Sequence, residues 1–214
     1  MILCLVTDRR RVCATDAPFA VARRCLVEQA RFAIAAGIDL IQVRERDLDT
    51  TSLADLVREI VQVARGTRTR VVVNDRLDVA MACGADGVHL RSDSIPADAV
   101  RRIAPSTFLV GRSVHGVDEA VSAGPVDYLV AGTVFSTASK PGGAVLGLDG
   151  LQAIARSVQV PVLAIGGVTV ERAAEVRAAG AAGVAAIGLF IGTPGATPCH
   201  LTPLEPVVAA LRRE

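Results

Sequence analysis

Short apolar runs alternate along the whole chain with longer stretches in which apolar residues recur every three or four positions. The short runs are rich in Val, Leu, Ile and Ala, which is typical of buried parallel strands, and the longer stretches have the periodicity of amphipathic helices. The predicted strands are Ile2–Thr7, Ile38–Val43, Arg70–Asn74, Gly87–Leu90, Phe108–Arg112, Val126–Ala131, Val162–Ile165 and Gly183–Ile187. The predicted helices are Phe19–Ala36, Thr51–Ala64, Arg76–Cys83, Pro96–Ala104, Val117–Ala123, Leu148–Val158, Val170–Ala179 and Pro203–Arg213.

Eight strand–helix pairs in strict alternation predict parallel strands with right-handed crossovers, and therefore an α/β fold of the TIM-barrel type, a closed (β/α)8 barrel. A faint repeat of two strand–helix pairs supports the barrel, because a small residue and a glycine precede every second strand. These glycines are Gly37, Gly84, Gly124 and Gly180. The alternative is an open doubly wound sheet, but no G-x-G-x-x-G motif follows the first strand. The 214 residues suit a single domain over 1–214.

Composition narrows the classes of function. The net charge is +1 and only 3% of residues are aromatic, so neither a basic nucleic-acid surface nor a stacking platform is expected. No apolar run reaches the roughly 18 residues of a membrane span, and the apolar start lacks a basic leader, so the cytoplasm is the expected compartment. The run Arg9, Arg10 and Arg11 is expected to be solvated surface. Five cysteines without a C-x-x-C spacing predict neither a disulfide framework nor a zinc site.

Polar side chains concentrate where the predicted strands end, and in a (β/α)8 barrel these ends build the active site. Alternation along the second strand directs Gln42, Arg44 and Arg46 to one side. A buried row of one amide and two cations is costly unless it faces a ligand or acids. We therefore expect these residues to bind anionic substrate groups. The alternative is a salt-bridge layer that closes the barrel rim.

Glycines follow the last two strands, where barrels usually hold phosphate. Gly166 and Gly167 come after the seventh strand, and Ile187 and Gly188 end the eighth. Glycine lets backbone N–H groups approach an anion, so these four residues form the predicted phosphate site. Glycine also serves tight turns, which is the alternative interpretation.

Two further groups could act on a substrate. His115 follows the fifth strand and can exchange protons near neutral pH, so it is the predicted catalytic residue, unless it only bonds backbone at a helix start. Lys140 lies in the long loop 132–147, where a cation beside hydroxyls suits an anionic substrate group, unless it is simply exposed. His89, inside a strand, is expected to be structural, and His200 is expected to be inert.

Taken together, these residues resemble the thiamine phosphate synthase/TenI family over nearly the whole chain. The resemblance implies a barrel, and it places Asn74, Ser113, Thr137 and Ser139 among the substrate-binding residues. The motifs that carry it are Gln42-Val43-Arg44-Glu45-Arg46, Val73-Asn74-Asp75-Arg76, Ala85-Asp86-Gly87-Val88-His89-Leu90, Gly111-Arg112-Ser113-Val114-His115, Asp127-Tyr128-Leu129-Val130-Ala131-Gly132, Thr137-Ala138-Ser139-Lys140 and Ala164-Ile165-Gly166-Gly167-Val168.

The resemblance implies one of two activities. The synthase couples a pyrimidine diphosphate to a thiazole phosphate with Mg²⁺, whereas the TenI-type tautomerase aromatises a thiazole carboxylate phosphate by a metal-independent proton shift. The synthase usually reads His-x-Gly-Gln-(Glu/Asp)-Asp after its fourth strand, and the final Asp binds Mg²⁺. Here Ser94 stands in that place, Arg91 replaces a glycine, and Arg46 replaces a lysine. These departures favour the tautomerase, an isomerase without a cofactor, with His115 as the proton shuttle.

Two alternatives stay open. In the synthase, a transferase, Asp75 would hold Mg²⁺ with Asp93 as a second ligand, and Gln42, Asn74 and Asp75 match the synthase pattern. The third hypothesis is a non-catalytic barrel that binds a phosphate ligand. The expected partner is a small phosphorylated thiazole, with no nucleic acid and no membrane, and a homodimer or higher homo-oligomer is compatible with the apolar composition.

Overall fold

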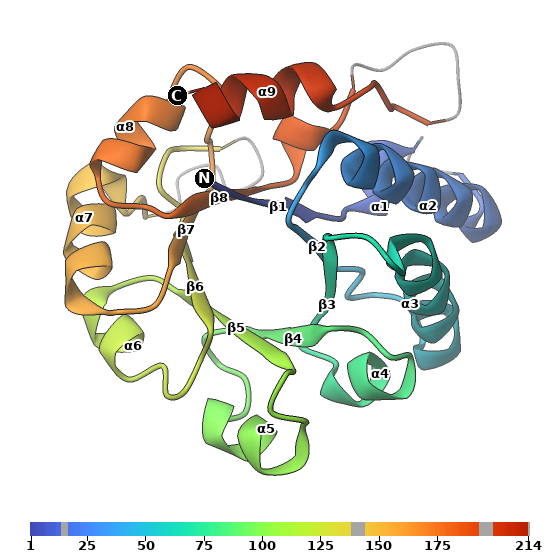
Figure 1. Cartoon of the computed structure of the whole chain (residues 1–214), viewed down its shortest axis with the longest axis horizontal. Helices are drawn as coiled ribbons and strands as arrows, with labels where there is room; N and C mark the ends of the chain where they lie inside the picture. Colours follow the sequence, from blue (N-terminus) through green and yellow to red (C-terminus); the bar gives the residue numbers. More distant parts are fainter. Residues whose placement is uncertain (14–16, 138–143, 193–198, 214) are drawn as a thin grey trace.

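Eight parallel strands form a closed barrel in which each strand pairs with the next and β8 pairs with β1 (Figure 1). The computed structural model describes residues 1–13, 17–137, 144–192 and 199–213. The strands are β1 (Ile2–Val6), β2 (Leu40–Val43), β3 (Arg70–Asn74), β4 (Gly87–Leu90), β5 (Leu109–Val114), β6 (Tyr128–Gly132), β7 (Val162–Ile165) and β8 (Gly183–Ala186). The (β/α)8 barrel is thus confirmed, and the open sheet is excluded.

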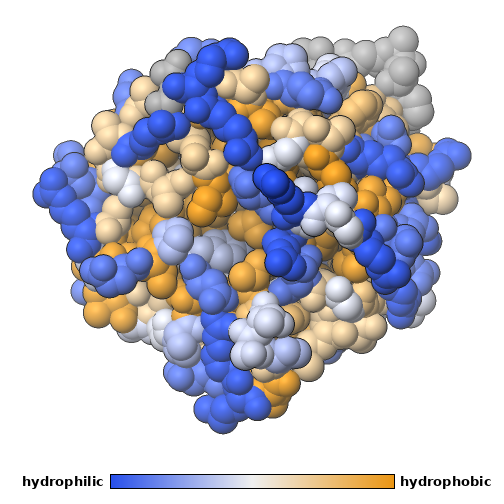
Figure 2. Space-filling model, in the orientation of Figure 1, coloured by the Kyte–Doolittle hydropathy of each residue, from blue (hydrophilic) through white to orange (hydrophobic). Residues whose placement is uncertain are grey.

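Helices ring the barrel on its outer side (Figure 1). They are α1 (Arg9–Val12), α2 (Phe19–Ala36), α3 (Thr50–Ala64), α4 (Leu77–Ala82), α5 (Ala97–Ile103), α6 (Val117–Val121), α7 (Gly147–Ser157), α8 (Ala173–Ala178), the 3-10 helix η1 (Gly188–Phe190) and α9 (Glu205–Arg213). None of the helices in the described ranges is long and apolar enough to cross a membrane. Figure 2 shows hydrophilic side chains over this helical ring and near the centre of the same face. That residues 1–214 form one domain stays a prediction.

The repeat in the sequence corresponds to a recurring hydrogen bond between an aspartate and a strand, here called the aspartate clamp. Gly37, Gly84, Gly124 and Gly180 all have positive φ, between 68° and 88°, and each lies just past the end of a helix. In three copies an aspartate follows within three residues, and its carboxylate accepts a hydrogen bond from the preceding odd-numbered strand. The bonds run from Leu3 N to Asp39 (2.8 Å), from Val71 N to Asp86 (2.8 Å) and from Val110 N to Asp127 (2.7 Å). These bonds fix the register of three strand pairs.

The barrel interior changes from apolar to polar along the strands. Its apolar cluster contains Cys4, Val6, Leu40, Val72, Tyr128, Val130, Leu163 and Ala185. Burial raises the pKa of the Cys4 thiol to about 12, so this cysteine is neutral. Toward the carboxyl ends the interior side chains become Gln42, Asn74, His89 and Ser113. The polar end of the interior is therefore the end at which a barrel builds its active site.

One cysteine pair departs from the prediction that no disulfide forms. Cys25 on α2 is bonded to Cys199, with a Cα–Cα distance of 5.4 Å across a sequence separation of 174 residues. Closure of the barrel brings the last segment of the chain beside the first helices, which a count of cysteine spacings does not reveal. Cys4 and Cys83 are buried thiols.

Candidate active site

Two arginines, Arg44 and Arg46, follow β2. Arg44 is half-buried and Arg46 is exposed. Burial, and next the neighbouring charge of Arg46, lower the pKa of Arg44 from its usual value, while the charges of Asp8 and Glu45 act against that fall. Within the described part of the chain, neither guanidinium takes part in an ion pair. A half-buried, unpaired cation beside a second one favours an anion at this position.

Glu45, between the two arginines, holds the loop in place. Its carboxylate is buried and accepts hydrogen bonds from Thr7 Oγ1 (2.8 Å), Arg9 N (3.2 Å) and Arg9 Nη1 (3.1 Å). Burial raises the pKa of Glu45, while the bonds from Thr7 and Arg9 act against that rise. Arg9 also pairs with Asp47 and is mostly covered, so the prediction that it is solvated surface is wrong. The salt-bridge layer at this rim is built by these residues and not by Arg44 and Arg46.

A polar row lies inside the barrel below this rim. Gln42 Nε2 donates to Asn74 Oδ1 at 3.0 Å. His89 Nε2 lies 2.9 Å from Ser113 Oγ, and His89 Nδ1 lies 3.2 Å from the Tyr128 hydroxyl. Burial lowers the pKa of His89 to about 3, so the ring is neutral at ordinary pH. These contacts place His89 in a buried hydrogen-bonded row, and its structural role stays a prediction.

The segment after β4 places a cation between two carboxylates. Arg91 Nη1 lies 3.6 Å from Asp75 Oδ2, and Arg91 Nη2 pairs with Asp93. Ser94 Oγ donates to the same Asp75 carboxylate and accepts from Arg91 N at 2.8 Å. Asp75 itself has a φ of 62°, a left-handed conformation that turns the chain sharply at the end of β3. Asp75, Asp93 and Ser94 thus form one group, and Arg91 is the residue of this group to which sequence reasoning gave no binding role.

The predicted phosphate loops lie after neighbouring strands. Gly166 and Gly167 have φ values of 98° and 64°, and a Cβ on Gly166 would lie 2.4 Å from Thr133 Cγ2, so only glycine fits there. Gly188 begins η1 directly after Ile187, its N-cap residue. A Cβ on Gly188 would lie 2.7 Å from Arg11 Nη2.

The Arg11 guanidinium therefore lies beside Gly188. Arg10 and Arg11 are exposed, as predicted for the run, but sequence reasoning gave Arg11 no place in the site. The signal that could have found it is its position just after the first strand, on the edge of the barrel that carries the site.

The remaining candidates lie in the loops after β5 and β6. His115 is exposed, its Nδ1 contacts the Gly132 carbonyl oxygen, and its backbone N–H donates to Glu119 Oε2 at 2.8 Å. It therefore joins the two loops. Thr137 is half-buried. Ser139 and Lys140 lie outside the described residues. A small cavity lined by Arg46, Asn74 and Arg76, among others, connects the β2 and β3 parts of the site.

The closed barrel with helices between its strands defines the class of fold, a (β/α)8 barrel with cations and glycine loops at its strand ends. Comparison with known proteins makes this specific. A family model described as thiamine monophosphate synthase matches residues 3–190. The chain is 46% identical over 174 residues to the thiamine-phosphate synthase of Methanoregula boonei, covering 80% of this chain and 81% of that protein. It is 41% identical over 196 residues to that of Roseiflexus castenholzii, covering 90% and 82%.

A solved structure agrees with these sequence matches. The structure described as thiamine phosphate pyrophosphorylase from Pyrococcus furiosus aligns with a TM-score of 0.78 and 32% identity, covering 99% of this chain and 94% of that one. The chain belongs to the thiamine monophosphate synthase family.

The prediction of a thiazole tautomerase is wrong, and with it the isomerase class. Relatives at 40–46% identity are named thiamine-phosphate synthase. The prediction gave too much weight to Ser94, which stands where a metal-binding carboxylate was expected. Mg²⁺ is commonly held by one or two carboxylates together with substrate phosphates, so a single lost carboxylate does not exclude it. The proton-shuttle role of His115 falls with the tautomerase.

Proposed function

We propose that this protein is a thiamine phosphate synthase, a transferase that couples a pyrimidine diphosphate to a thiazole phosphate and releases pyrophosphate. The observation that carries the proposal is the pair of unpaired cations at Arg44 and Arg46. Both substrates and the leaving group are anions, and a half-buried arginine without a carboxylate partner gains most from such a ligand. The names of the relatives support the same reaction.

The two ends of the site suit the two phosphorylated substrates. Gly166, Gly167, Ile187 and Gly188 would take the single phosphate of the thiazole through backbone N–H groups, with Arg11 as the neighbouring cation. After β2, which only β1 separates from β8, Arg44 and Arg46 would bind the diphosphate.

Neutral polar groups would complete the pyrimidine side. Gln42 and Asn74, already joined by a hydrogen bond, offer an amide row below the diphosphate. Ser113, Thr137, Ser139 and Lys140 remain predicted contacts of the substrates.

The chain's own residues have two tasks in this reaction. The thiazole ring nitrogen forms a bond to the carbon that carries the diphosphate, and the carbon–oxygen bond to the diphosphate breaks with its electrons going to pyrophosphate. Arg44 and Arg46 would stabilise the negative charge that grows on the leaving oxygen, which is electrostatic catalysis. The phosphate loops would hold the thiazole so that its nitrogen faces that carbon.

The donor set after β3 and β4 fits Mg²⁺ with one carboxylate from the protein. Asp75 would hold the ion, and Ser94 and Asp93 lie beside it. When bound, Mg²⁺ supplies positive charge to the diphosphate oxygens. Arg91 contributes positive charge to the same group of carboxylates, and its guanidinium would compete with the ion for Asp75.

A direct assay tests the proposal. The purified protein is incubated with the pyrimidine diphosphate and the thiazole phosphate, with and without Mg²⁺, and both thiamine phosphate and pyrophosphate are quantified. The expected result is equimolar formation of the two products, stimulated by Mg²⁺. If neither product forms while both substrates bind, the non-catalytic barrel would replace the synthase.

A further inference from the structure

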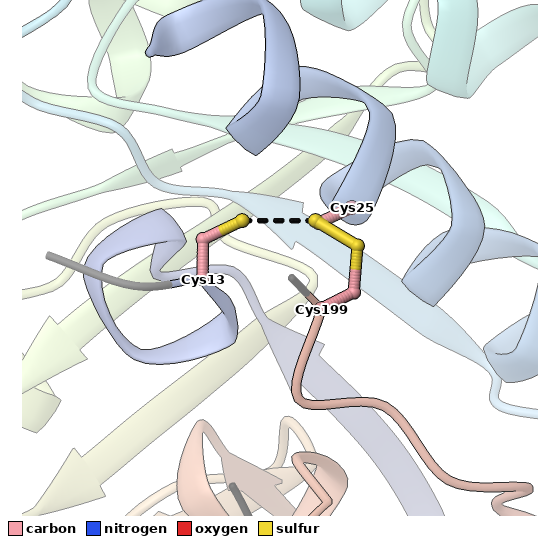
Figure 3. A group of neighbouring side chains, drawn as sticks. All are labelled: Cys13, Cys25 and Cys199. Atoms are coloured by element: carbon pink, nitrogen blue, oxygen red, sulfur yellow. Dashed lines mark hydrogen bonds between the residues drawn. A yellow bond between two sulfur atoms is a disulfide. The ribbon is translucent and has the colours of Figure 1, made fainter. Parts of the chain in front are cut away.

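Three cysteine sulfurs meet where the first helices contact the last segment of the chain (Figure 3). Cys25 is bonded to Cys199, and Cys13 Sγ lies 2.8 Å from Cys25 Sγ. All three sulfurs lie within 4.8 Å of one another. Cys13 and Cys25 are buried, and Cys199 is half-buried. The cysteine cluster of these three residues lies outside the proposed active site and has no part in the coupling reaction.

The arrangement matches the geometry of thiol–disulfide exchange. In this reaction a thiolate attacks one sulfur of a disulfide, and the other sulfur leaves. Figure 3 shows Cys13 and Cys199 on opposite sides of the Cys25 sulfur, so Cys13 approaches from the side away from the leaving sulfur. An antiparallel β-bridge between the backbones of Cys13 and Cys199 fixes the positions of the attacking and the leaving cysteine.

We propose that Cys13, Cys25 and Cys199 form a thiol–disulfide exchange site that moves one crosslink between two positions. The Cys13 thiolate forms a bond to Cys25 Sγ, the Cys25–Cys199 bond breaks, and Cys199 leaves as a thiolate. Cys13 loses a proton and Cys199 takes one up. Each side of the reaction therefore has one disulfide and one thiol. The exchange therefore needs no oxidant or reductant.

Exchange changes what the crosslink holds. The Cys25–Cys199 bond ties the last segment of the chain to α2, whereas a Cys13–Cys25 bond ties only the neighbouring α1 to α2. In the first state the last segment is joined to α1 by the hydrogen bond from His200 N to Val12 O at 2.7 Å. In the second state that hydrogen bond and the backbone bridge lose their covalent support.

The exchange site adjoins the phosphate loops, and this link rests on the proposed function. Val12 follows Arg11, whose guanidinium lies beside Gly188. Gln29, one turn beyond Cys25 on α2, donates to the Phe190 carbonyl oxygen of η1 at 3.0 Å. The residues that would hold the thiazole phosphate are thus fastened to the same helices as the cysteine cluster. Transfer of the crosslink is expected to weaken phosphate binding.

Mapping of disulfides in the intact protein tests the exchange. The protein is equilibrated in a glutathione redox buffer at several pH values, quenched with acid, alkylated in denaturant, and digested for mass spectrometry. Both the Cys25–Cys199 and the Cys13–Cys25 pairings are expected, in a ratio that does not change with the glutathione potential. The rate at which that ratio is reached should rise about tenfold per pH unit below the pKa of the attacking thiol, because only the thiolate reacts.

Trapped variants make the result decisive. Cys13→Ala should contain only the Cys25–Cys199 bond and Cys199→Ala only the Cys13–Cys25 bond, while Cys83→Ala, at a buried thiol elsewhere, should behave as wild type. A single pairing in the wild type under all conditions, or no Cys13–Cys25 bond in Cys199→Ala, would overturn the proposal. Stoichiometric zinc held by the reduced wild type and lost in both cluster variants would also overturn it, in favour of a metal site.

Binding of inorganic phosphate tests the link to the active site. Calorimetry is expected to show several-fold weaker binding to Cys199→Ala than to Cys13→Ala. Equal affinities would refute the link. If phosphate binds to neither variant nor to the wild type, the proposed phosphate site fails, and the disulfide maps still decide whether exchange occurs.

Discussion

Replacement of Arg44 by Gln tests whether this cation binds an anionic ligand or stabilises the fold. Burial and the charge of Arg46 lower the pKa of Arg44 more than the charges of Asp8 and Glu45 raise it, and Arg44 forms no ion pair among the described residues. The folded protein without ligand therefore gains by losing this charge. Repulsion between two charges 4 Å apart is about 1 kcal/mol in water and rises in a less polar setting. We expect the free energy of unfolding to stay constant or to increase by up to about 1 kcal/mol.

The same substitution should weaken binding of the diphosphate group. A hydrogen bond to a charged partner contributes about 1.5–3 kcal/mol. Loss of one such bond weakens binding by about 10- to 150-fold. Titration calorimetry with inorganic pyrophosphate measures the affinity, and urea denaturation measures the stability, on the same preparation.

The result that would refute this reasoning is the opposite pair of changes. If Arg44→Gln lowers the free energy of unfolding by more than about 1.5 kcal/mol and leaves pyrophosphate affinity unchanged, Arg44 is a structural residue. Arg58→Gln is the matched control, because Arg58 is exposed on α3 and pairs with Asp55 at 2.9 Å. That control should leave affinity unchanged and cost at most about 0.5 kcal/mol of stability.

Three further predictions follow from the same structure. Burial lowers the pKa of His89 to about 3, below the unfolded value of 6.5, so the unfolded state takes up the proton first. Stability should fall as pH drops from 6.5 toward 3, by about 2 kcal/mol at pH 5, and urea denaturation of His89→Gln should lack this part of the loss. Ser94→Asp places a second carboxylate beside Asp75 and should tighten Mg²⁺ binding about tenfold or more by calorimetry; unchanged affinity would place the ion elsewhere. Reduction of the Cys25–Cys199 disulfide should lower stability by about 2–5 kcal/mol for so long a closed loop. In scanning calorimetry that corresponds to a fall in Tm of about 5–15 °C, and an equal Tm in both redox states would contradict it.

Much of the barrel could be predicted because its strands and long helices carry strong local signals. Helix α2 has the predicted bounds, since an apolar stripe fills it and Gly37 ends it in a left-handed conformation. The same holds for β3, β4 and β7, which are short runs with Val, Leu or Ile in them. Helices α1 and η1 were missed because four and three residues are too few to show a helical period. Helix α8 begins at Ala173, three residues later than predicted, because a turn closed by the bond from Ala173 N to Val170 O precedes it.

The site was harder to predict than the fold, because its pairings join distant segments. The positions of Arg44 and Arg46 after β2 follow from alternation and from the rule that barrels act at their strand ends. That Glu45 would be neutralised by Arg9, and that Arg91 would lie between Asp75 and Asp93, depends on contacts across loops that no local pattern encodes. The choice between two activities failed for a related reason. The change to Ser94 was judged alone, although Asp75, Arg91 and Asp93 also determine the charge at that place.

The aspartate clamps also bear on how the barrel opens. Three strand pairs are fastened by Asp39, Asp86 and Asp127, but Ala182 stands at the matching place before β8 and has no carboxylate to offer Val162. Of the four pairs that begin with an odd-numbered strand, β7–β8 is therefore the one without a clamp in the described part of the chain, and it carries the glycine loops. In amide hydrogen exchange, β7 and β8 should exchange before the clamped pairs, so local opening of the barrel would begin beneath the phosphate loops.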